Sequence, residues 1–230
     1  MVFGHDSSRI AAMPPLKPPA PRAYRSAHRD AAAAHTRDRV VAAARELLAA
    51  GDGLRGFSLE AVAQRAGVTR LTVYNQFGSR RALLEAMFDD LAQRGGLQDI
   101  AAAMAEADPR AALSQLVAVF CRFFASAHPL MQPLMAAAAS DPELHESVRQ
   151  RNERRRQLMK VLVSRMKARG EVRTEAARDL VDVLWALTSA PFFIELTAAG
   201  RSTKAACDLV QGLVDDAVRR ASTKAGDRLA

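Results

Sequence analysis

The stretch FSLEAVAQRAGVTRLTVYNQFGSRRALLEAM, from Phe57 to Met87, decides the fold of this protein. It divides into three short helices, and each follows a residue that commonly caps helix N-termini: Ser58, Thr69 and Ser79. Gly67 ends the first helix, because a residue without a Cβ adopts the left-handed conformation without strain. A second helix that begins after a turn of about three residues is typical of a helix-turn-helix.

The charge of this stretch favours nucleic acid as a partner. Residues 54–81 contain five arginines against the single Glu60. Two of them, Arg80 and Arg81, open the third helix, where the helix dipole disfavours cations. Free backbone amides and two guanidiniums at one helix start suit a phosphate oxygen. The alternative is a solvated arginine pair on a surface helix.

The order of these residues resembles the DNA-binding domain of the TetR family of bacterial transcriptional regulators. The matching positions are Ala63, Ala66, Gly67, Val68, Thr69, Thr72, Val73, Tyr74, Phe77, Ser79, Arg80, Leu83 and Leu84. The resemblance implies a recognition helix at residues 69–77 in the major groove. The residues implied in DNA binding are Ser58, Thr69, Arg70, Leu71, Thr72, Tyr74, Gln76, Arg80 and Arg81. In the family the position of Arg80 is usually a lysine, and that of Arg81 is often acidic.

The composition of the whole chain fits this interpretation. The 230 residues are 49% hydrophobic and only 5% aromatic, with abundant alanine, which favours helices over sheets. A net charge of +8 indicates an acidic partner such as nucleic acid. Cys121 and Cys207 follow no pattern, so we expect reduced thiols in the cytoplasm. The sequence contains no metal-ligand cluster or phosphate-binding loop, so neither a metal nor a cofactor is expected.

The chain divides into three predicted segments. Residues 1–35 are rich in proline, alanine and arginine and predict a disordered basic tail. This tail has no role, or it reflects a start codon placed too early, or it acts as an arm that contacts DNA. Residues 36–95 predict the DNA-binding domain, whose first helix runs from Thr36 to Ala50. Residues 96–230 predict a helical regulatory and dimerisation domain. No apolar core near Met1 indicates a secretory signal, and no membrane partner is expected.

Capping residues divide the C-terminal domain into helices. Asp108 and Asp141 each precede a proline and begin a helix, and Ser202 caps the last helix. One helix is predicted from Thr174 to Gly200. The uncharged span Phe123–Ser140 contains two prolines, so it predicts the end of a helix, a turn and a short helix rather than a membrane span.

The resemblance also implies a ligand cavity among these helices. The residues predicted to line it are Phe120, Phe123, Phe124, Met131, Met135, Trp185, Phe192 and Phe193, with an ordinary core as the alternative. Glu195 and His128 are candidate polar anchors. The run of arginines between Arg149 and Arg156 alternates with glutamates, so it predicts a solvated helix face, with a second nucleic-acid patch as the alternative.

The last two helices predict a dimer: Ala177–Leu187 is apolar on most sides, and Thr203–Ala221 forms the last helix. Its apolar stripe is wider than one neighbouring helix needs, and the predicted subunit interface is Leu209, Val210, Leu213 and Val214. The sequence as a whole predicts an all-α, homodimeric, ligand-responsive repressor that binds a near-palindromic operator and a small apolar or amphipathic ligand. The alternatives are an activator, a ligand-independent regulator, a helical enzyme or an interaction scaffold. No catalytic constellation can be assembled, so no enzyme is expected.

Overall fold

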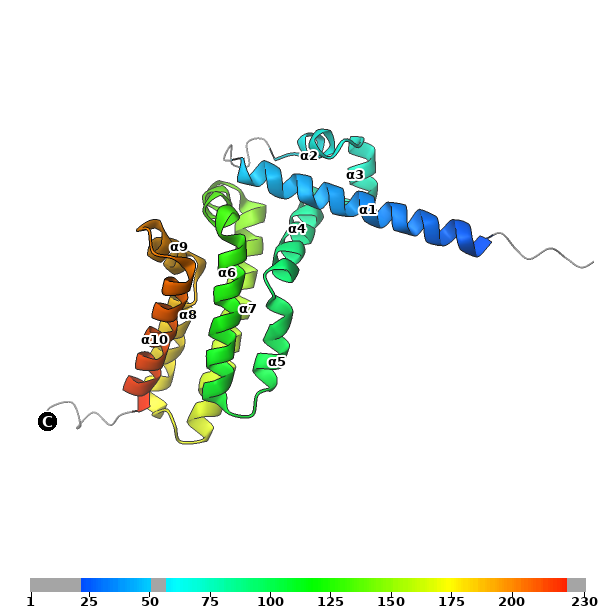
Figure 1. Ribbon diagram of the computed structural model, residues 1–230. Helices are drawn as coiled ribbons and strands as arrows, with labels where there is room; N and C mark the ends of the chain where they lie inside the picture. Colours follow the sequence, from blue (N-terminus) through cyan, green and yellow to red (C-terminus); the bar gives the residue numbers. More distant parts are fainter. Residues whose placement is uncertain (1–21, 51–56, 223–230) are drawn as a thin grey trace, which may run out of the picture. The chain divides into compact units, whose positions relative to one another are not determined.

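The computed structural model describes residues 22–50 and 57–222, which fold into helices joined by short turns (Figure 1). These described residues include no strand, which confirms the predicted all-α class. The chain divides between Thr36 and Arg37 into two units, and every tertiary contact discussed below lies in the second. Predictions for residues 1–21 and for the loop 51–56 fall outside the described residues.

Helix α1 spans Arg22–Ala49, so the prediction that it begins at Thr36 was wrong. The side chains from Asp30 to His35 are exposed, and they include a run of alanines. That prediction began the helix where an apolar face begins. A solvated helix needs no apolar face, because residues of high helix propensity can extend a segment that is already packed. That packed segment begins at Val40, which is fully buried.

The next three helices form the predicted helix-turn-helix and its continuation. They are α2 (Leu59–Ala66), α3 (Arg70–Phe77) and α4 (Arg80–Arg94). Ser58, Thr69 and Ser79 cap them as predicted, and Gly67 ends α2 with a φ of 64°. Buried apolar residues from α1 to α4 form the core of this region: Val40, Ala44, Leu48, Val62, Ala63, Ala66, Val73, Phe77, Leu83 and Leu84.

The C-terminal region begins with a short 3-10 helix η2 (Leu97–Asp99) and α5 (Ile100–Ala105). It continues with two long antiparallel helices, α6 (Pro109–Ser140) and α7 (Pro142–Ala168), which pack side by side (Figure 1). Asp108 and Asp141 cap these two helices as predicted, with a proline at the first position of each.

Helix α6 does not break at its prolines, so the turn predicted within Phe123–Ser140 was wrong. Pro129 is exposed, and the apolar residues beyond it, such as Met131 and Leu134, are buried. Packing of those residues offsets the backbone hydrogen bonds that the prolines remove. By length and composition α6 could cross a membrane, but half of its most apolar window is buried inside the protein.

The predicted helix from Thr174 to Gly200 is instead a 3-10 turn η3 (Thr174–Ala176) followed by two helices, α8 (Ala177–Leu187) and α9 (Ala190–Ala198). The chain bends by 51° between them. Ser189 caps α9 by accepting a hydrogen bond from the N–H of Phe192, and Pro191 lies in its first turn. The last helix, α10 (Thr203–Ser222), packs against α8, α6 and α9.

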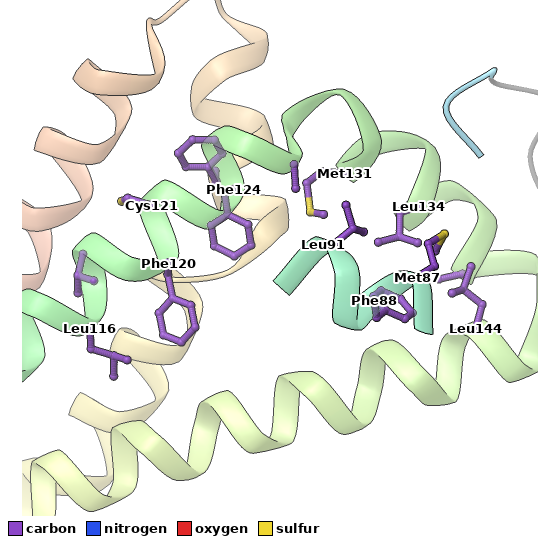
Figure 2. Close-up of a cluster of buried hydrophobic side chains, with 14 of the residues drawn as sticks. Met87, Phe88, Leu91, Leu116, Phe120, Cys121, Phe124, Met131, Leu134 and Leu144 are labelled. Atoms are coloured by element: carbon purple, nitrogen blue, oxygen red, sulfur yellow. The ribbon is translucent and has the colours of Figure 1, made fainter. Parts of the chain in front are cut away.

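One buried cluster joins α4 to the C-terminal helices (Figure 2). Met87, Phe88 and Leu91 of α4 meet residues of α6 and Leu144 at the start of α7. The contributors from α6 include Phe120, Phe124, Met131 and Leu134. Helix α4 therefore belongs both to the core of the helix-turn-helix region and to the core of the C-terminal region.

Close packing at Gly95, directly after α4, gives a test of this joint. A Cβ placed there would lie 2.5 Å from Cδ2 of Phe123 and 3.0 Å from its Cα. Because the backbone of α6 cannot move aside freely, we expect Gly95→Ala to lower the free energy of unfolding by about 1–3 kcal/mol. Gly212→Ala is the control, since nothing lies within 4 Å of that position in α10.

In this control alanine should stabilise the helix by about 0.5–1 kcal/mol, because glycine loses more conformational freedom on folding. Urea unfolding of both variants at one protein concentration measures the two effects. A Gly95→Ala protein as stable as the wild type would show that α4 and α6 do not approach each other this closely.

Candidate functional site

Three side chains project from the outer face of α3. Arg70 is exposed, Leu71 is 65% exposed and Tyr74 is 56% exposed, and together they line one shallow surface hollow. Val73 and Phe77 on the opposite face are buried. Large apolar side chains this exposed are unusual for a helix whose only task is to pack, so the outer face of α3 is a candidate contact surface.

The hydroxyl groups near this face also hold the local backbone. Oγ of Ser58 accepts the N–H of Ala61 at 3.0 Å. Oγ1 of Thr69 accepts the N–H of Thr72 at 3.1 Å, and the two threonine hydroxyls lie 2.8 Å apart. These contacts fix the start of α2 and of α3 while leaving Ser58 and Thr69 exposed. Gln76 is half-buried, and its backbone oxygen accepts a hydrogen bond from Arg37.

Arg80, predicted to be free for a phosphate, is bound within the protein. Its guanidinium lies 2.7 Å from Oδ2 of Asp141 and 3.0 Å from Oε2 of Glu143, and its Nε donates to the carbonyl of Phe57. The positive charge at the start of α4 is therefore compensated in part by the two carboxylates at the start of α7. Arg81 is exposed and forms no hydrogen bond or ion pair among the described residues, so it is the guanidinium at this position that is open to solvent.

A second ion pair joins α4 and α7 further along. Arg151 lies 2.7 Å from Oε2 of Glu85, and its guanidinium stacks 4.1 Å from the centre of the Phe88 ring. Burial alone would raise the pKa of Glu85, but hydrogen bonds from Arg151 and Ser147 outweigh it and lower that pKa. The carboxylate of Glu85 is thus held in its charged form by α7.

A cavity of about 300 Å³ lies beside this pair, among α4, η2, α5, α6 and α7. Its apolar lining includes Phe88, Leu97, Ile100, Phe120, Phe123, Phe124 and Leu158. Its polar lining comes mainly from α7, with Arg151, Asn152, Arg154 and Arg155, and from Asp89 of α4. Three of the eight residues predicted to line a ligand cavity, Phe120, Phe123 and Phe124, do line this one.

The other five do not line it. Met131 and Phe193 are buried in the core, where the ring of Phe193 lies 5.6 Å from that of Phe124. Met135 and Phe192 are half-buried and pack against the core. Trp185 donates from Nε1 to the carbonyl of Asn152. The two predicted polar anchors are also elsewhere, since Nε2 of His128 lies 3.1 Å from Oγ1 of Thr197 and Glu195 is exposed.

The arginines of α7 are not the uniformly solvated face that was predicted. Arg155 is only 6% exposed, Arg151 pairs with Glu85, and Arg156 pairs with Asp182. A signal for this was present in the sequence. Arg151 and Arg155 lie at four-residue spacing before Met159, which places them on the buried stripe of α7. Only Arg149, paired with Glu146 on the surface, and Arg154 are exposed as predicted.

Comparisons with known proteins agree with this arrangement. Residues 40–87 match the family described as "Bacterial regulatory proteins, tetR family". Residues 105–217 match the family described as "Tetracyclin repressor-like, C-terminal domain", and the two matches together cover more than half of the chain. The chain belongs to the TetR family. It is therefore a transcriptional regulator with a helix-turn-helix, and its C-terminal region is the helical domain of that family.

Solved structures share the fold across nearly their whole lengths. A proposed fatty acid metabolism regulator from Clostridium perfringens is 14% identical, with a TM-score of 0.62 over 77% of this chain and 97% of that chain. A transcriptional regulator from Rhodococcus sp. RHA1 is 20% identical, with a TM-score of 0.60 over 82% and 98%. A TetR-like regulator from Rhodococcus sp. RHA1 is 19% identical, with a TM-score of 0.56 over 80% and 96%. No curated protein sequence matches the chain.

The predicted subunit interface of this TetR-family protein needs correction. Val210 and Val214 are buried within the chain, because α10 packs this stripe against its own neighbours, so they are not available to a second subunit. Leu209 and Leu213 are half-buried. Leu213 instead lines a second hollow, of about 350 Å³, between α8 and α10, together with Val183, which is 43% exposed.

Asp141 has two roles that substitution can separate. It caps α7 by accepting the N–H of Leu144 at 2.8 Å, and it pairs with Arg80. Burial alone would raise the pKa of Asp141, but the hydrogen bonds from Arg80 and Leu144 outweigh it and lower that pKa below its usual range. A carboxylate of this kind stabilises the fold above its unfolded pKa, and the effect is lost as pH falls through the folded pKa.

We therefore expect Asp141→Ala to lower the free energy of unfolding by about 1–3 kcal/mol at neutral pH, through loss of the cap and of the charged hydrogen bond. Asp141→Asn keeps a capping oxygen and should lose only part of this. Glu143→Ala, which removes the more exposed partner of Arg80, should cost less than about 1 kcal/mol. Unfolding curves at neutral and acid pH measure these differences, which should shrink on acidification. Equal stability of Asp141→Ala and the wild type at neutral pH would contradict the assignment.

Proposed function

We propose that this protein is a ligand-responsive repressor that binds a near-palindromic operator as a homodimer. The observation that carries the proposal is that α4 contributes both to the core beneath α3 and to the wall of the cavity. Its first half supplies Leu83 and Leu84 to the core beneath the recognition helix α3, and its second half supplies Phe88 and Asp89 to the wall of the cavity. A ligand in the cavity therefore touches the helix that supports α3.

The outer face of α3 has the chemistry that base readout in the major groove requires. Arg70 suits the paired acceptors of guanine, and Leu71 suits the methyl group of thymine. Tyr74, Thr72 and Gln76 lie in the same helix, and in this proposal they contact bases or the DNA backbone. Arg81 supports the proposal as a phosphate contact, because it lies at the start of α4 with no ion pair among the described residues.

Arg80 has a different role in this proposal. A phosphate contact would require it to leave Asp141 and Glu143, which hold it on the C-terminal region. We therefore assign Arg80 to the joint between the two regions rather than to resting contact with DNA. Repression would follow when the joint keeps α3 at the spacing that the operator requires, and induction when ligand binding shifts α4 and changes that spacing.

A dimer is required because one recognition helix reads only one half-site. The exposed Val183 and the half-buried Leu213 and Leu187 beside the hollow between α8 and α10 favour this surface as the subunit contact. A second copy related by two-fold symmetry would place α8 and α10 of both subunits in one four-helix arrangement. The proposed interface is thus centred on Val183, Leu187 and Leu213.

Substitution of Arg70 tests the DNA-binding surface. On an operator selected in vitro from random duplexes, Arg70→Ala should weaken binding by about 1–3 kcal/mol and relax the preference at one base pair. Arg81→Ala should weaken binding evenly across sequences and reduce the slope of log affinity against log salt by about one. Arg149→Ala is the matched control, because Arg149 is also an exposed arginine and lies on α7, away from α3.

Fluorescence anisotropy titrations at several salt concentrations measure all three variants. The control should bind like the wild type, which shows that loss of one surface charge is not sufficient. If a folded Arg70→Ala protein keeps wild-type affinity and sequence preference, α3 is not the helix that reads the operator.

A further inference from the structure

The cavity has one apolar side and one cationic side. Four phenylalanines of α4 and α6 line it together with aliphatic side chains, and α7 contributes Arg151, Arg154 and Arg155. The only carboxylate in the lining is that of Asp89, which is 81% exposed and lies 3.7 Å from Arg151. Three guanidiniums against one carboxylate leave the lining with a net positive charge.

Arg155 is the unusual member of this group. It is 6% exposed and donates to the carbonyl of Trp185 at 2.7 Å, to Oγ1 of Thr188 at 3.0 Å and to Oδ1 of Asn152 at 3.3 Å. All three acceptors are neutral, and no carboxylate within the described residues pairs with this guanidinium. A buried charge is costly without a counter-ion, and the protein supplies none here.

The pKa of Arg155 is consistent with a charge that no carboxylate pairs with. Burial lowers its pKa to about 10, and no nearby anion opposes that shift. The guanidinium nevertheless stays charged at neutral pH. The ring of Trp185, whose centre lies 5.6 Å from the guanidinium carbon, offers the charge a π face but no counter-ion.

Arg154 and Arg151 complete the cationic side in different ways. Arg154 is exposed and has no hydrogen bond, ion pair or ring contact among the described residues. Arg151 is already paired with Glu85. Inside the cavity, an anion could therefore pair with the buried Arg155 and with the exposed Arg154, neither of which has a carboxylate partner. It would have to compete with Glu85 of α4 for Arg151.

We propose that the cavity binds a small organic carboxylate, with its anionic head on Arg155 and Arg154 and its apolar body among Phe88, Phe120 and Phe124. This inference rests on the proposed function and names the chemical class of its ligand. A carboxylate matches the planar fork of a guanidinium and supplies the missing counter-ion. Phenylalanine rings accept an aromatic or short aliphatic body.

Size and charge exclude other ligand classes. A volume of about 300 Å³ is at the lower end of the roughly 300–1,000 Å³ typical of ligand pockets, so a nucleotide or a long acyl chain does not fit without enlargement. A cationic ligand would meet three arginines. A neutral ligand would leave Arg155 without a counter-ion, so it should bind less tightly than a carboxylate of the same shape.

The proposal also suggests how binding reaches α4. A bound carboxylate competes with Glu85 for Arg151, which loosens the ion pair between α7 and α4. It lies at the same time against Phe88, on the next turn of α4 from Glu85. Both effects act on the helix that supports α3.

Two sets of probes that differ only in the head group test the ligand class. One set is phenylbutyrate, phenylbutyramide and phenylbutylamine, and the other is octanoate, octanamide and octylamine. Trp185 is the only tryptophan of the chain and lies against Arg155, so its fluorescence reports binding at the head-group site. Titration calorimetry on the full chain gives the affinities independently.

We expect at least one carboxylate to bind about tenfold or more tightly than its amide, and the amines not to bind. Arg155→Met should abolish the preference for the carboxylate over the amide, and Arg155→Lys should retain part of it. Arg154→Gln alters an exposed residue and should reduce the preference without affecting the fold. Arg149→Met on the same helix is the control and should change nothing.

The proposal is overturned if neither carboxylate binds at millimolar concentration, or if the amide of a binding pair binds as tightly as the carboxylate. It is also overturned if a folded Arg155→Met protein keeps the preference. If Arg155→Met does not fold, an unchanged preference in Arg154→Gln overturns it. Operator titrations on the same preparations separate the failure of this inference from the failure of the proposed function. If a carboxylate binds with the expected selectivity but leaves operator affinity unchanged, the anion site is supported and the ligand-responsive repressor is contradicted.

Discussion

Two arginines, Arg80 and Arg151, hold α4 against the α7 end of the joint through ion pairs, and the rest of the structure depends on these contacts. Arg80 at the start of α4 pairs with Asp141 and Glu143 at the start of α7, and Glu85 further along α4 pairs with Arg151 of α7. The Arg80–Asp141 and Arg151–Glu85 pairs are partly shielded from solvent, so they contribute more than exposed surface pairs do. They also fix orientation, because paired groups on successive turns of one helix resist its rotation. The apolar cluster beneath them supplies most of the stabilisation but would tolerate small shifts of α4.

This joint gives α4 its position between two sites. Its first turn completes the support of α3, and its later turns form one wall of the cavity beside Arg151. The same arginine therefore belongs to the joint and to the cavity lining. A uniformly apolar joint could transmit only changes of shape, whereas one that contains an ion pair also responds to the charge of whatever enters the cavity. Arg155, one turn further along α7, is buried without a carboxylate partner, so it favours an anion in the cavity over a neutral molecule.

The sequence predicted the features that depend on neighbouring residues. The caps at Ser58, Thr69 and Ser79 and the helix predicted at residues 69–77 were correct, because capping and helical spacing are local. The arginines of α7 and Arg80 were interpreted wrongly, because their partners lie far away in the sequence; Arg80 and Asp141 are 61 positions apart. The break before α9 was missed although Ser189 and Pro191 give the same kind of signal as Asp108 and Pro109. Continuity of α6 through Pro129 was not predictable locally, since it depends on packing.

The most direct test of the coupling is a double-mutant cycle on Glu85 and Arg151, read out as operator affinity. Neither residue lies on the outer face of α3. The account predicts that Glu85→Gln and Arg151→Gln each weaken operator binding, because a looser α4 must be ordered again on DNA. The double mutant should lose less than the sum of the two, with a coupling of about 0.5 kcal/mol or more. Folded single variants that bind operator as tightly as the wild type would contradict the account.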